Sequence, residues 1–466
     1  MDRQGGRSLG WMVGVSALIL AIASSVRHGL LQSNAWDLGI FDQPLYLMSQ
    51  GLPPISTIIN IHILGDHAAW IFYPLSLLYR VVPDVHWLLG IQAIALASGA
   101  IPTWYLAQQA GLKPAQTQAM AAVYLLYPLI VNLNLFDFHP EVIALPLMLT
   151  AIYLARANRI LGFSLCVVVA LGCRDALSLT IAAMGVWLWC FEGRRVCGAI
   201  AMSLGLIWFL VATQVIIPHY QPLGIPGASH YRAFGNSIPE IMLNILLRPD
   251  ILLRSLVTLP NAGYLLVLLA PVAWGLHWGH LAPFVAAIPQ LAMNLLSSHL
   301  ALKDVVHQYS LPILPFLLVS VIAALAAERT WLQQPRRIVL WALAGFVALG
   351  QFYLFGSRYL STIDTWQASR AAIAQIQTTA PVLAPAALVP HLTHRPVIHV
   401  VASGEVAIAD YGYILLNLRH PGRVSSPAAV AQLRDRLRQS PAFQLDYERD
   451  DVYLFRNTTL VPDTAQ

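Results

Sequence analysis

The feature that most constrains this chain is a series of long apolar stretches divided by short polar turns. A helix needs about 20 apolar residues to cross a bilayer, and several stretches reach or approach that length. They are residues 11–28, 86–108, 115–134, 140–157, 159–172, 175–191, 197–217, 261–277, 280–296, 310–327 and 336–355. Charged residues make up only 11% of the 466 positions, compared with about 25% in soluble domains. We therefore predict an all-α polytopic membrane bundle of about 11 transmembrane helices.

Residues 1–356 form this predicted transmembrane domain, and its first outer loop extends from 29 to 85. Within the loop, residues 68–82 are also apolar, but as a helix they make only about four turns. We interpret this segment as an interfacial or re-entrant helix, and the sequence leaves open whether it crosses the membrane.

The placement of the basic residues predicts the orientation of the bundle. Arginines and lysines cluster at alternate ends of the apolar stretches, at Arg3 and Arg7, Lys113, Arg156 and Arg159, Arg194 and Arg195, and Arg329, Arg336 and Arg337. The positive-inside tendency assigns such ends to the cytoplasm. We therefore expect a multi-pass membrane protein with a cytoplasmic N-terminus and an extracytoplasmic C-terminus. The net charge of +5 then needs no nucleic-acid partner.

From about residue 357 the composition becomes that of a water-exposed domain. Residues 366–378 and 426–440 are typical of amphipathic helices, and residues 396–402, 411–416, 443–447 and 452–455 are typical of strands. The last two strands flank Glu448-Arg-Asp-Asp451, which indicates a hairpin. We predict a small extracytoplasmic α/β domain over residues 357–466.

The stretch Asn34-Ala-Trp-Asp-Leu-Gly-Ile-Phe-Asp-Gln43 follows the first apolar stretch and contains two acids, Asp37 and Asp42. Acids among apolar side chains at a membrane edge are costly unless they bind a cation, a proton or a polar ligand. A polar loop with an N-cap aspartate is the alternative interpretation. We take Asp37 and Asp42 as candidate functional acids.

Polar residues recur at the other predicted outer turns. These are Asp66 and His67, His139 and Glu141, Arg174 and Asp175, Arg232, and His307 and Tyr309. Each group also has a purely structural interpretation: helix caps for the first two pairs, a mutually satisfied pair for Arg174 and Asp175, and interfacial anchors for His307 and Tyr309. Because five predicted outer loops carry the same residue types, we interpret them as a candidate binding site for an anionic substrate whose lipid part lies in the bilayer.

The residue types in this set suit phosphate chemistry. A carboxylate can accept a proton from a hydroxyl group, or hold a divalent ion such as Mg²⁺ or Mn²⁺ that offsets phosphate charge. Arginine or histidine can bind a phosphate leaving group. The ligand spacing fits no particular metal, so a metal cofactor stays an open expectation.

Five motifs carry a resemblance to a known family: Asp37-Leu-Gly-Ile-Phe-Asp-Gln43, Leu64-Gly-Asp-His67, Asp137-Phe-His-Pro-Glu141, Arg174-Asp-Ala-Leu177 and His307-Gln-Tyr309. They resemble those of a family of polytopic bacterial membrane proteins built on a domain of unknown function. That family is similar to a branch of the GT-C glycosyltransferase superfamily. The resemblance covers roughly residues 10–360, and Val389-Pro-His-Leu-Thr-His-Arg395 resembles the family's outer domain.

The resemblance implies a GT-C-like bundle in the bacterial inner (plasma) membrane, with an outer active site in the first loop and a polyprenyl-phosphate-linked sugar as donor. Asp37 matches the first-loop acid of such enzymes, which acts as a base or a metal ligand. It is therefore the first candidate for a catalytic acid, and Asp42 is the second. The other outer-turn residues would then bind the donor, with Arg232 and His307 as weaker candidates. The chain departs from the expected acid–acid pair before Ala176-Leu177, because it has Arg174-Asp175 there, and this change favours phosphate binding over a metal site.

We therefore expect an integral membrane glycosyltransferase that moves a sugar from a polyprenyl phosphate to an acceptor on the extracytoplasmic face. One alternative is a transporter or flippase of a lipid-linked or small polar substrate, which the scarcity of ionisable residues within the predicted spans disfavours. A second alternative is a non-catalytic membrane scaffold, which should tolerate alanine at Asp37.

Overall fold

The computed structural model describes residues 3–222, 227–402, 407–422 and 424–462, and the chain forms two compact units. Unit 1 consists of Met1–Ala23, Leu64–Ile71 and Leu89–Phe352, and unit 2 of Ser24–Ile63, Phe72–Leu88 and Tyr353–Gln466. The predicted domain boundary at residue 357 is close to Tyr353, where the chain re-enters unit 2. However, most of the predicted first outer loop also belongs to unit 2, so the units group segments that are far apart in the sequence.

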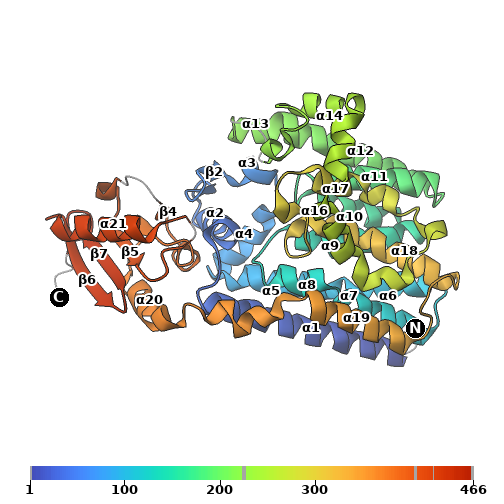
Figure 1. Cartoon of the computed structure of the whole chain (residues 1–466), viewed down its shortest axis with the longest axis horizontal. Coiled ribbons are helices and arrows are strands. Elements are labelled where there is room, and N and C mark those ends of the chain that lie inside the picture. The colour runs from blue at the N-terminus through green and yellow to red at the C-terminus, as the bar shows by residue number, and fades with distance from the viewer. Residues whose placement is uncertain (1–2, 223–226, 403–406, 423, 463–466) are drawn as a thin grey trace. The chain divides into compact units, whose positions relative to one another are not determined.

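Unit 1 is a bundle of helices (Figure 1). Its helices are α6 (Ala100–Gln109), α7 (Pro114–Leu125), α8 (Pro128–Asn134), α9 (Glu141–Arg156), α10 (Ile160–Leu171), α11 (Leu177–Cys190), α12 (Arg195–Val211), α13 (Ile217–Tyr220), α14 (Ile238–Leu247), α15 (Pro249–Leu256), α16 (Leu259–Leu269), α17 (Phe284–Leu296), α18 (Leu314–Ala326) and α19 (Pro335–Leu349). Three helices have residues in both units: α1 (Arg3–Gly29), α3 (Ile63–His67) and α5 (His86–Ser98).

Five helical stretches within the described residues are long and apolar enough to cross a membrane: Gly5–Gly29, His86–Gln109, Arg195–Tyr220, Gln308–Ala326 and Pro335–Leu360. The bent pair Pro249–Leu256 and Leu259–Gly275 makes a sixth if it is one span. Several other expected spans are shorter helices; α11, with 14 residues, is about 21 Å long, against a hydrocarbon core of about 30 Å. Several helices suited to crossing a membrane are thus present among the described residues, whereas the number of 11 spans stays a prediction.

Helices α11 and α12 pack closely because glycines line their contact. A Cβ atom on Gly185 would lie 2.6 Å from the carbonyl oxygen of Gly198, and one on Gly205 would lie 2.6 Å from that of Ser178. Only the hydrogen of a glycine fits at these two positions. Small residues of this kind promote helix packing in lipid, where the burial of apolar surface alone does not drive helices together.

The expected span at 115–134 is broken between α7 and α8, and a buried amide in α8 binds the backbone of two other segments. Helix α7 ends at Leu125, and Pro128 begins α8, consistent with the preference of proline for the first helical turn. Asn132 donates hydrogen bonds to the carbonyl oxygens of Val305 (2.9 Å) and Leu349 (3.0 Å). Such side chains replace the water that irregular backbone would otherwise require.

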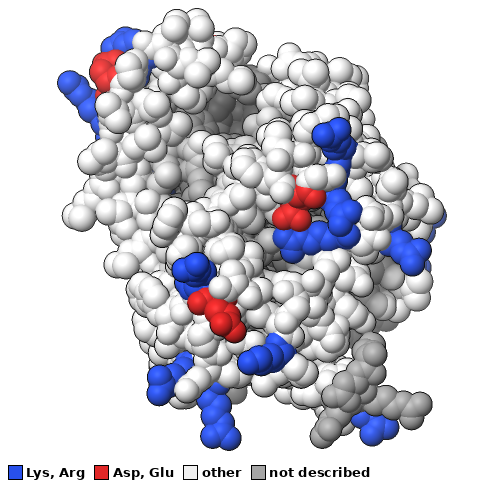
Figure 2. All heavy atoms as spheres, turned by 90° about the vertical axis from the view of Figure 1, so that its right-hand side faces the viewer, with Lys and Arg blue, Asp and Glu red and all other residues white. Residues whose placement is uncertain are grey.

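The basic turns of unit 1 gather at one end of the bundle. Arg156 binds Glu192 through two hydrogen bonds of 2.9 and 2.7 Å, and Arg194 donates to Asn158 at 2.6 Å, so the α9–α10 and α11–α12 turns are neighbours. Figure 2 shows the end of unit 1 near the N-terminus, where basic side chains are more widespread than acidic ones. This charge asymmetry agrees with the distribution expected from the sequence.

Unit 2 contains an α/β layer built on a five-stranded sheet of order β4-β3-β5-β7-β6. The strands are β3 (Val382–Ala384), β4 (Ile398–Val400), β5 (Tyr413–Asn417), β6 (Phe443–Arg449) and β7 (Val452–Asn457), and the helices are α20 (Ile363–Gln375) and α21 (Pro427–Gln439). Strand β3 is parallel to β4 and β5, and the other pairs are antiparallel. The remaining elements of the unit are α2 (Ile40–Ser49), α4 (Phe72–Val81) and the short strands β1 (Ile55–Ser56) and β2 (Ile61–His62).

Most of this layer was predicted correctly. The four expected strands and two helices are present, and the hairpin turns at Asp450 and Asp451, both with positive φ, as a type I′ turn requires. Strand β3 was missed because it has three residues and is flanked by Pro381 and Pro385. The helix expected at 68–82 is observed as α4, which begins only at Phe72.

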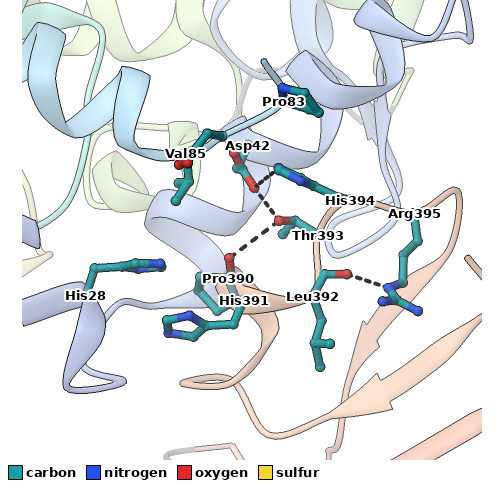
Figure 3. Close-up of a pocket in the computed structure, with 11 residues that line it drawn as sticks. His28, Asp42, Pro83, Val85, Pro390, His391, Leu392, Thr393, His394 and Arg395 are labelled. Carbon is teal, nitrogen blue, oxygen red and sulfur yellow. Dashed lines mark hydrogen bonds and ion pairs between the residues drawn. The ribbon is translucent and has the colours of Figure 1, made fainter. Parts of the chain in front are cut away.

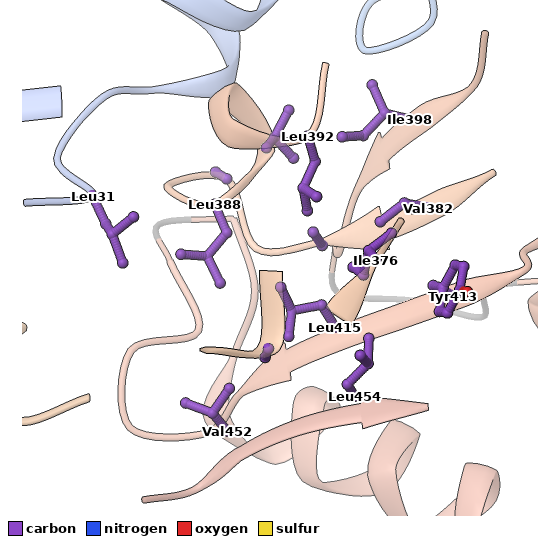
Figure 4. Close-up of a cluster of buried hydrophobic side chains, with 14 of the residues drawn as sticks. Leu31, Ile376, Val382, Leu388, Leu392, Ile398, Tyr413, Leu415, Val452 and Leu454 are labelled. Atoms are coloured by element: carbon purple, nitrogen blue, oxygen red, sulfur yellow. The ribbon is translucent and has the colours of Figure 1, made fainter. Parts of the chain in front are cut away.

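The alternation of side chains along the central strands gives the sheet two apolar faces. Leu415 and Leu454 pack with α20 on one face, and Leu416 and Phe455 pack with α21 on the other, as the two-residue period of a strand dictates. Leu31, from the first loop, joins the α20 face (Figure 4). The first loop is therefore part of the hydrophobic core of unit 2.

Hydrogen bonds fix the first loop to the same layer. The Gln43 side chain donates to the carbonyl oxygens of Arg395 (3.2 Å) and Pro396 (3.3 Å). Thr57 donates to the carbonyl oxygen of Ile398 at 2.7 Å and accepts from its N–H at 2.9 Å. Because these contacts satisfy both side chains and backbone, the loop is held in one conformation against the start of β4.

Candidate functional sites

Asp42 is a fully buried carboxylate in the first turn of α2. The Tyr79 hydroxyl donates to Oδ1 at 2.5 Å, the Thr393 hydroxyl donates to Oδ2, and His394 Nε2 lies 3.3 Å from Oδ2. A carboxylate tolerates burial only when donors of this kind replace water. The structure thus joins the first loop to the Val389–Arg395 motif around one charge.

A pocket of about 270 Å³ lies beside this carboxylate within unit 2 (Figure 3). It is formed by the end of α1, the turn after α4 and the segment that follows β3. Its polar lining residues are His28, Asp42, Asp84, His391, Thr393, His394 and Arg395. The rings of His28 and His391 stack with their centroids 4.0 Å apart, so imidazoles form one wall of the pocket.

The two histidines of the motif have opposite electrostatic surroundings. Burial and the positive charge of Arg370 lower the pKa of His391 to about 4, so its ring is neutral at pH 7. Burial also acts against protonation of His394, but the hydrogen bond and charge of Asp42, with the charge of Asp84, outweigh it and raise the pKa of His394. The pocket therefore holds a neutral imidazole and an imidazole that binds protons more readily.

Asp37, the first candidate for the catalytic acid, has different surroundings. It lies in the π-helical turn Ala35–Gly39 directly before α2 and is half-buried. The Asn34 side chain donates to Asp37 Oδ2 at 3.1 Å. Asp37 does not belong to the pocket lining, whereas Asp42 does. The two first-loop acids therefore have different surroundings and are available for different roles.

A second polar group lies in unit 1, where Arg174 is sandwiched between a carboxylate and an aromatic ring. Its guanidinium donates a hydrogen bond to Glu141 Oε1, and its Cζ atom lies 5.3 Å from the ring centroid of Tyr309. The side chains of Arg174 and Glu141 are only 13% and 2% exposed. Glu141 Oε2 is buried and has no hydrogen-bond partner among the described residues, so one acceptor of the group is unused.

His67 lies between two carboxylates next to this group. Its Nδ1 atom is 3.3 Å from Asp175 Oδ1, and its Nε2 atom is 3.6 Å from Asp66 Oδ2. Burial and the charge of Arg174 lower its tendency to bind a proton, but Asp66 and Asp175 together outweigh them and raise the pKa of His67. The predicted residues Asp66, His67, Glu141, Arg174, Asp175 and Tyr309 are thus brought together, as the sequence suggested.

The turn that carries Arg174 depends on Gly172. A Cβ atom there would overlap the indole of Trp70, and the N–H of Ile71 donates to the Gly172 carbonyl oxygen at 3.0 Å. Glycine therefore lets the two segments of unit 1 that carry His67 and Arg174 approach closely.

His139 and His307 are joined through one aromatic ring. His139 stacks on Phe136 with ring centroids 5.1 Å apart, and His307 packs edge-on against Phe136 at 4.4 Å. His307 Nδ1 lies 2.7 Å from Asp304 Oδ2. Arg232, in contrast, is exposed, and no contact given for the described residues joins it to these groups.

Sequence reasoning missed several residues of the two groups. Tyr79 and Thr393 bind Asp42, and His394 was noted only as part of a motif. Gln92 accepts from the N–H of His139 at 3.3 Å. Asp137 is buried with φ at 117°, and such backbone outliers cluster at functional sites. The position of Asp137 in the Asp137–Glu141 motif could have identified it from the sequence. Tyr79 and Gln92 lie in apolar helices, and no sequence pattern distinguished them.

The described residues do not fit a resident metal ion. Within the ranges that the structure describes, no group of three or more His, Cys, Asp or Glu side chains could hold one. Both oxygens of Asp42 already accept hydrogen bonds from protein hydroxyls. The chemistry proposed below therefore uses this chain's own side chains.

The fold and these polar groups define a multi-pass membrane protein with an α/β layer in its second unit. The chain matches the family described as "Predicted membrane protein (DUF2079)" over residues 27–454, and it belongs to that family. No curated protein matches it.

The fold is similar to solved structures of ArnT from Cupriavidus metallidurans, in agreement with the expected GT-C resemblance. For ArnT bound to undecaprenyl phosphate, the TM-score is 0.57 with 12% sequence identity, and the match covers 98% of this chain and 99% of ArnT. For ArnT in the apo state, the TM-score is 0.55 with 13% identity, and the match covers 96% and 98%. At this level of identity, the likeness concerns the fold.

Proposed function

We propose that the protein is an integral membrane glycosyltransferase that transfers a sugar from a polyprenyl-phosphate donor to an acceptor on the extracytoplasmic face. The observation that carries the proposal is the buried Arg174 group of unit 1, in a fold that matches nearly all of an ArnT structure bound to undecaprenyl phosphate. A buried cation held by one carboxylate and one aromatic ring is expensive to maintain. A phosphate ligand would account for it.

Arg174 is the group we assign to the donor phosphate. Its guanidinium uses one donor on Glu141, and a guanidinium has five N–H donors in a planar fork that suits phosphate oxygens. Glu141 holds the cation in place while its second oxygen is unused. His67, kept more basic by Asp66 and Asp175, adds a second positive charge when protonated.

In the reaction, the acceptor oxygen bonds to the anomeric carbon as the bond from that carbon to the phosphate oxygen breaks. The electron pair of the broken bond leaves on the polyprenyl phosphate, and the acceptor hydroxyl loses its proton to a base. We propose Asp37 as a carboxylate that serves this step, either by accepting the proton or by stabilising positive charge on the sugar carbon.

For the orientation, we propose that the basic end of unit 1 faces the cytoplasm of a bacterium, in its inner membrane. We also propose, from the distribution of basic residues along the sequence, that the sheet layer of unit 2 is extracytoplasmic. Cysteine accessibility tests this directly, because Cys190 is exposed at the basic α11–α12 turn. A membrane-impermeant thiol reagent should label Cys190 in inverted vesicles and not in intact spheroplasts.

A transporter of a lipid-linked substrate is the second candidate, because paired ionisable residues buried in a membrane bundle, such as Arg174 and Glu141, also mark transport pathways. The deciding experiment measures sugar transfer from a labelled polyprenyl-phosphate sugar pool in membranes. The variants are Asp37→Ala and Arg174→Gln, with Asp435→Ala as the control because Asp435 is an exposed acid of unit 2.

The proposal expects transfer by the wild type and the control, and a loss of 100-fold or more, roughly the weight of one catalytic group, in the two test variants. Equal transfer by all four proteins would remove Asp37 and Arg174 from the mechanism. Absence of transfer by the wild type across a panel of donor sugars, combined with uptake or flipping of the labelled lipid, would favour transport instead.

A further inference from the structure

The Val389–Arg395 motif supplies two of the groups around Asp42, Thr393 and His394. Together with Asp42, these contacts orient the imidazole of His394. Asp42 is fixed by the Tyr79 and Thr393 hydroxyls, so its carboxylate has one orientation. His394 Nε2 faces this carboxylate at 3.3 Å. The ring of Tyr46 lies parallel to the His394 ring, 4.9 Å away and inclined by 8°. The imidazole is therefore held by both its edge and its face.

This orientation determines which nitrogen is available for chemistry. A carboxylate at Nε2 favours the tautomer that carries hydrogen there, which leaves the lone pair on Nδ1. The His394 side chain is 33% exposed, whereas that of Asp42 is 1% exposed, and both line the pocket. A buried acid, a histidine beside it and a pocket that both side chains line are the elements of a general base.

The rest of the pocket indicates what kind of group it receives. His391 Nε2 is buried and has no hydrogen-bond partner among the described residues, and buried polar atoms of this kind normally have one. The lining carries the carboxylates of Asp42 and Asp84 against one guanidinium, and Arg395 already donates to the carbonyl oxygens of Leu392 and Ala380. This balance disfavours a phosphate, whereas hydroxyl groups both donate and accept. The volume of about 270 Å³ is slightly below the usual range of roughly 300–1,000 Å³ for ligand sites, so one small group fits.

We propose that this pocket receives the reacting hydroxyl group of the sugar acceptor, that His394 takes its proton, and that Asp42 is a positioning residue for the imidazole. The inference rests on the proposed glycosyl transfer and assigns its proton acceptor. As the acceptor oxygen bonds to the anomeric carbon, its proton moves to His394 Nδ1, and the electron pair of the broken bond leaves on the polyprenyl phosphate. Asp42 stabilises the resulting imidazolium.

The first test is the pH dependence of transfer in the full-length protein. The titratable groups that face His394 are Asp42, Tyr46, Tyr79, Asp84, His391 and Arg395. A base must be deprotonated, so wild-type kcat should fall as the pH decreases through a pKa above the ordinary 6.5 of histidine.

Three variants complete this test. His394→Gln should lose about 100-fold or more of kcat, keep its KM for the donor, and lose the acidic limb of the profile. Asp42→Asn should move that limb to lower pH. His420→Gln is the matched control, because His420 pairs with Asp364 at 2.8 Å, is 30% exposed and lies outside the pocket lining. Full activity with an unchanged acidic limb in His394→Gln would overturn the inference.

The second test does not depend on activity. Carbethoxylation by diethyl pyrocarbonate, followed for each histidine peptide across pH, reports the pKa of individual rings in the full chain. We expect the midpoint for His394 to fall in Asp42→Asn while that for His420 stays constant. An unchanged His394 midpoint would overturn this inference alone. If the His394 midpoint falls in Asp42→Asn but the wild-type protein transfers no sugar, the proposed function is overturned, and with it the role of His394 as base.

Discussion

Asp175 holds His67 through both main chain and side chain. The N–H of Asp175 donates to the His67 carbonyl oxygen at 3.0 Å, and the Asp175 carboxylate lies 3.3 Å from the His67 ring. The backbone contact fixes the distance between the end of α3 and the start of α11, and the side-chain contact makes the energy of that arrangement depend on the charge of one imidazole. Unit 1 therefore contains, beside Arg174, a contact between α3 and α11 whose strength depends on the protonation of His67.

The pH dependence of thermal stability should reveal the His67–Asp175 contact. The pKa of His67 is raised on folding, so its stabilising contribution is present below the unfolded pKa of about 6.5 and is lost as the pH rises through the folded pKa. We expect the thermal stability of the wild type to exceed that of His67→Gln most at pH 6 and progressively less at higher pH. The exposed His219→Gln should show no such trend, and a gap that grows with pH would contradict the assignment.

Replacement of Arg174 by alanine should destabilise the protein strongly. The change leaves Glu141 buried without its cation, and breaking one partner of a buried pair typically costs about 3–5 kcal/mol. The double variant Arg174→Met with Glu141→Gln should recover much of this loss, because no uncompensated charge remains. Arg248→Ala is the matched control, since its pair with Asp250 is more than half exposed. Thermal unfolding in detergent measures all four proteins.

Gly172→Ala should disrupt the turn that carries Arg174. The added Cβ would overlap the Trp70 indole, so either the indole or the turn must move, with a cost of about 1–3 kcal/mol. Trp70→Ala in the same chain should restore part of the stability by removing the overlap. Gly263→Ala should have little effect, because no atom lies within 4 Å of the corresponding Cβ. Equal melting temperatures for the two alanine variants would show that the overlap is relieved at no cost.

Acid should destabilise unit 2 through His391. Its pKa is lowered to about 4 by burial and the charge of Arg370, whereas in the unfolded chain it is about 6.5. The unfolded state therefore binds a proton that the folded state excludes, and stability falls as the pH decreases from about 6.5 to about 4. His391→Phe should stack on His28 without titrating, so its unfolding temperature should decline less over this interval. A parallel decline in both proteins would assign the acid sensitivity to other groups.

The sequence was most informative where a regular pattern repeats. Short apolar runs bounded by polar turns predicted the strands observed as β5 and β7, and hydropathy located the apolar segments. It could not locate Tyr79 as a partner of Asp42, because a tyrosine in an apolar helix has the same local pattern whether it binds a carboxylate or lipid. The residue types at Glu141, Arg174 and Tyr309 suggested a common site, but only the structure assigns Arg174 to Glu141 rather than to its neighbour Asp175.

The composition of unit 2 from distant segments has a consequence for biosynthesis. Gln43 and Arg395, joined by a hydrogen bond, are 352 positions apart, and the core around Leu31 contains residues up to Leu454. During translation, the first-loop acids emerge long before the residues that bury or orient them. Asp42 consequently stays hydrated and its pocket unformed until almost the whole chain has left the ribosome, so a prematurely terminated chain carries the first-loop motif without the surroundings in which we propose that it works.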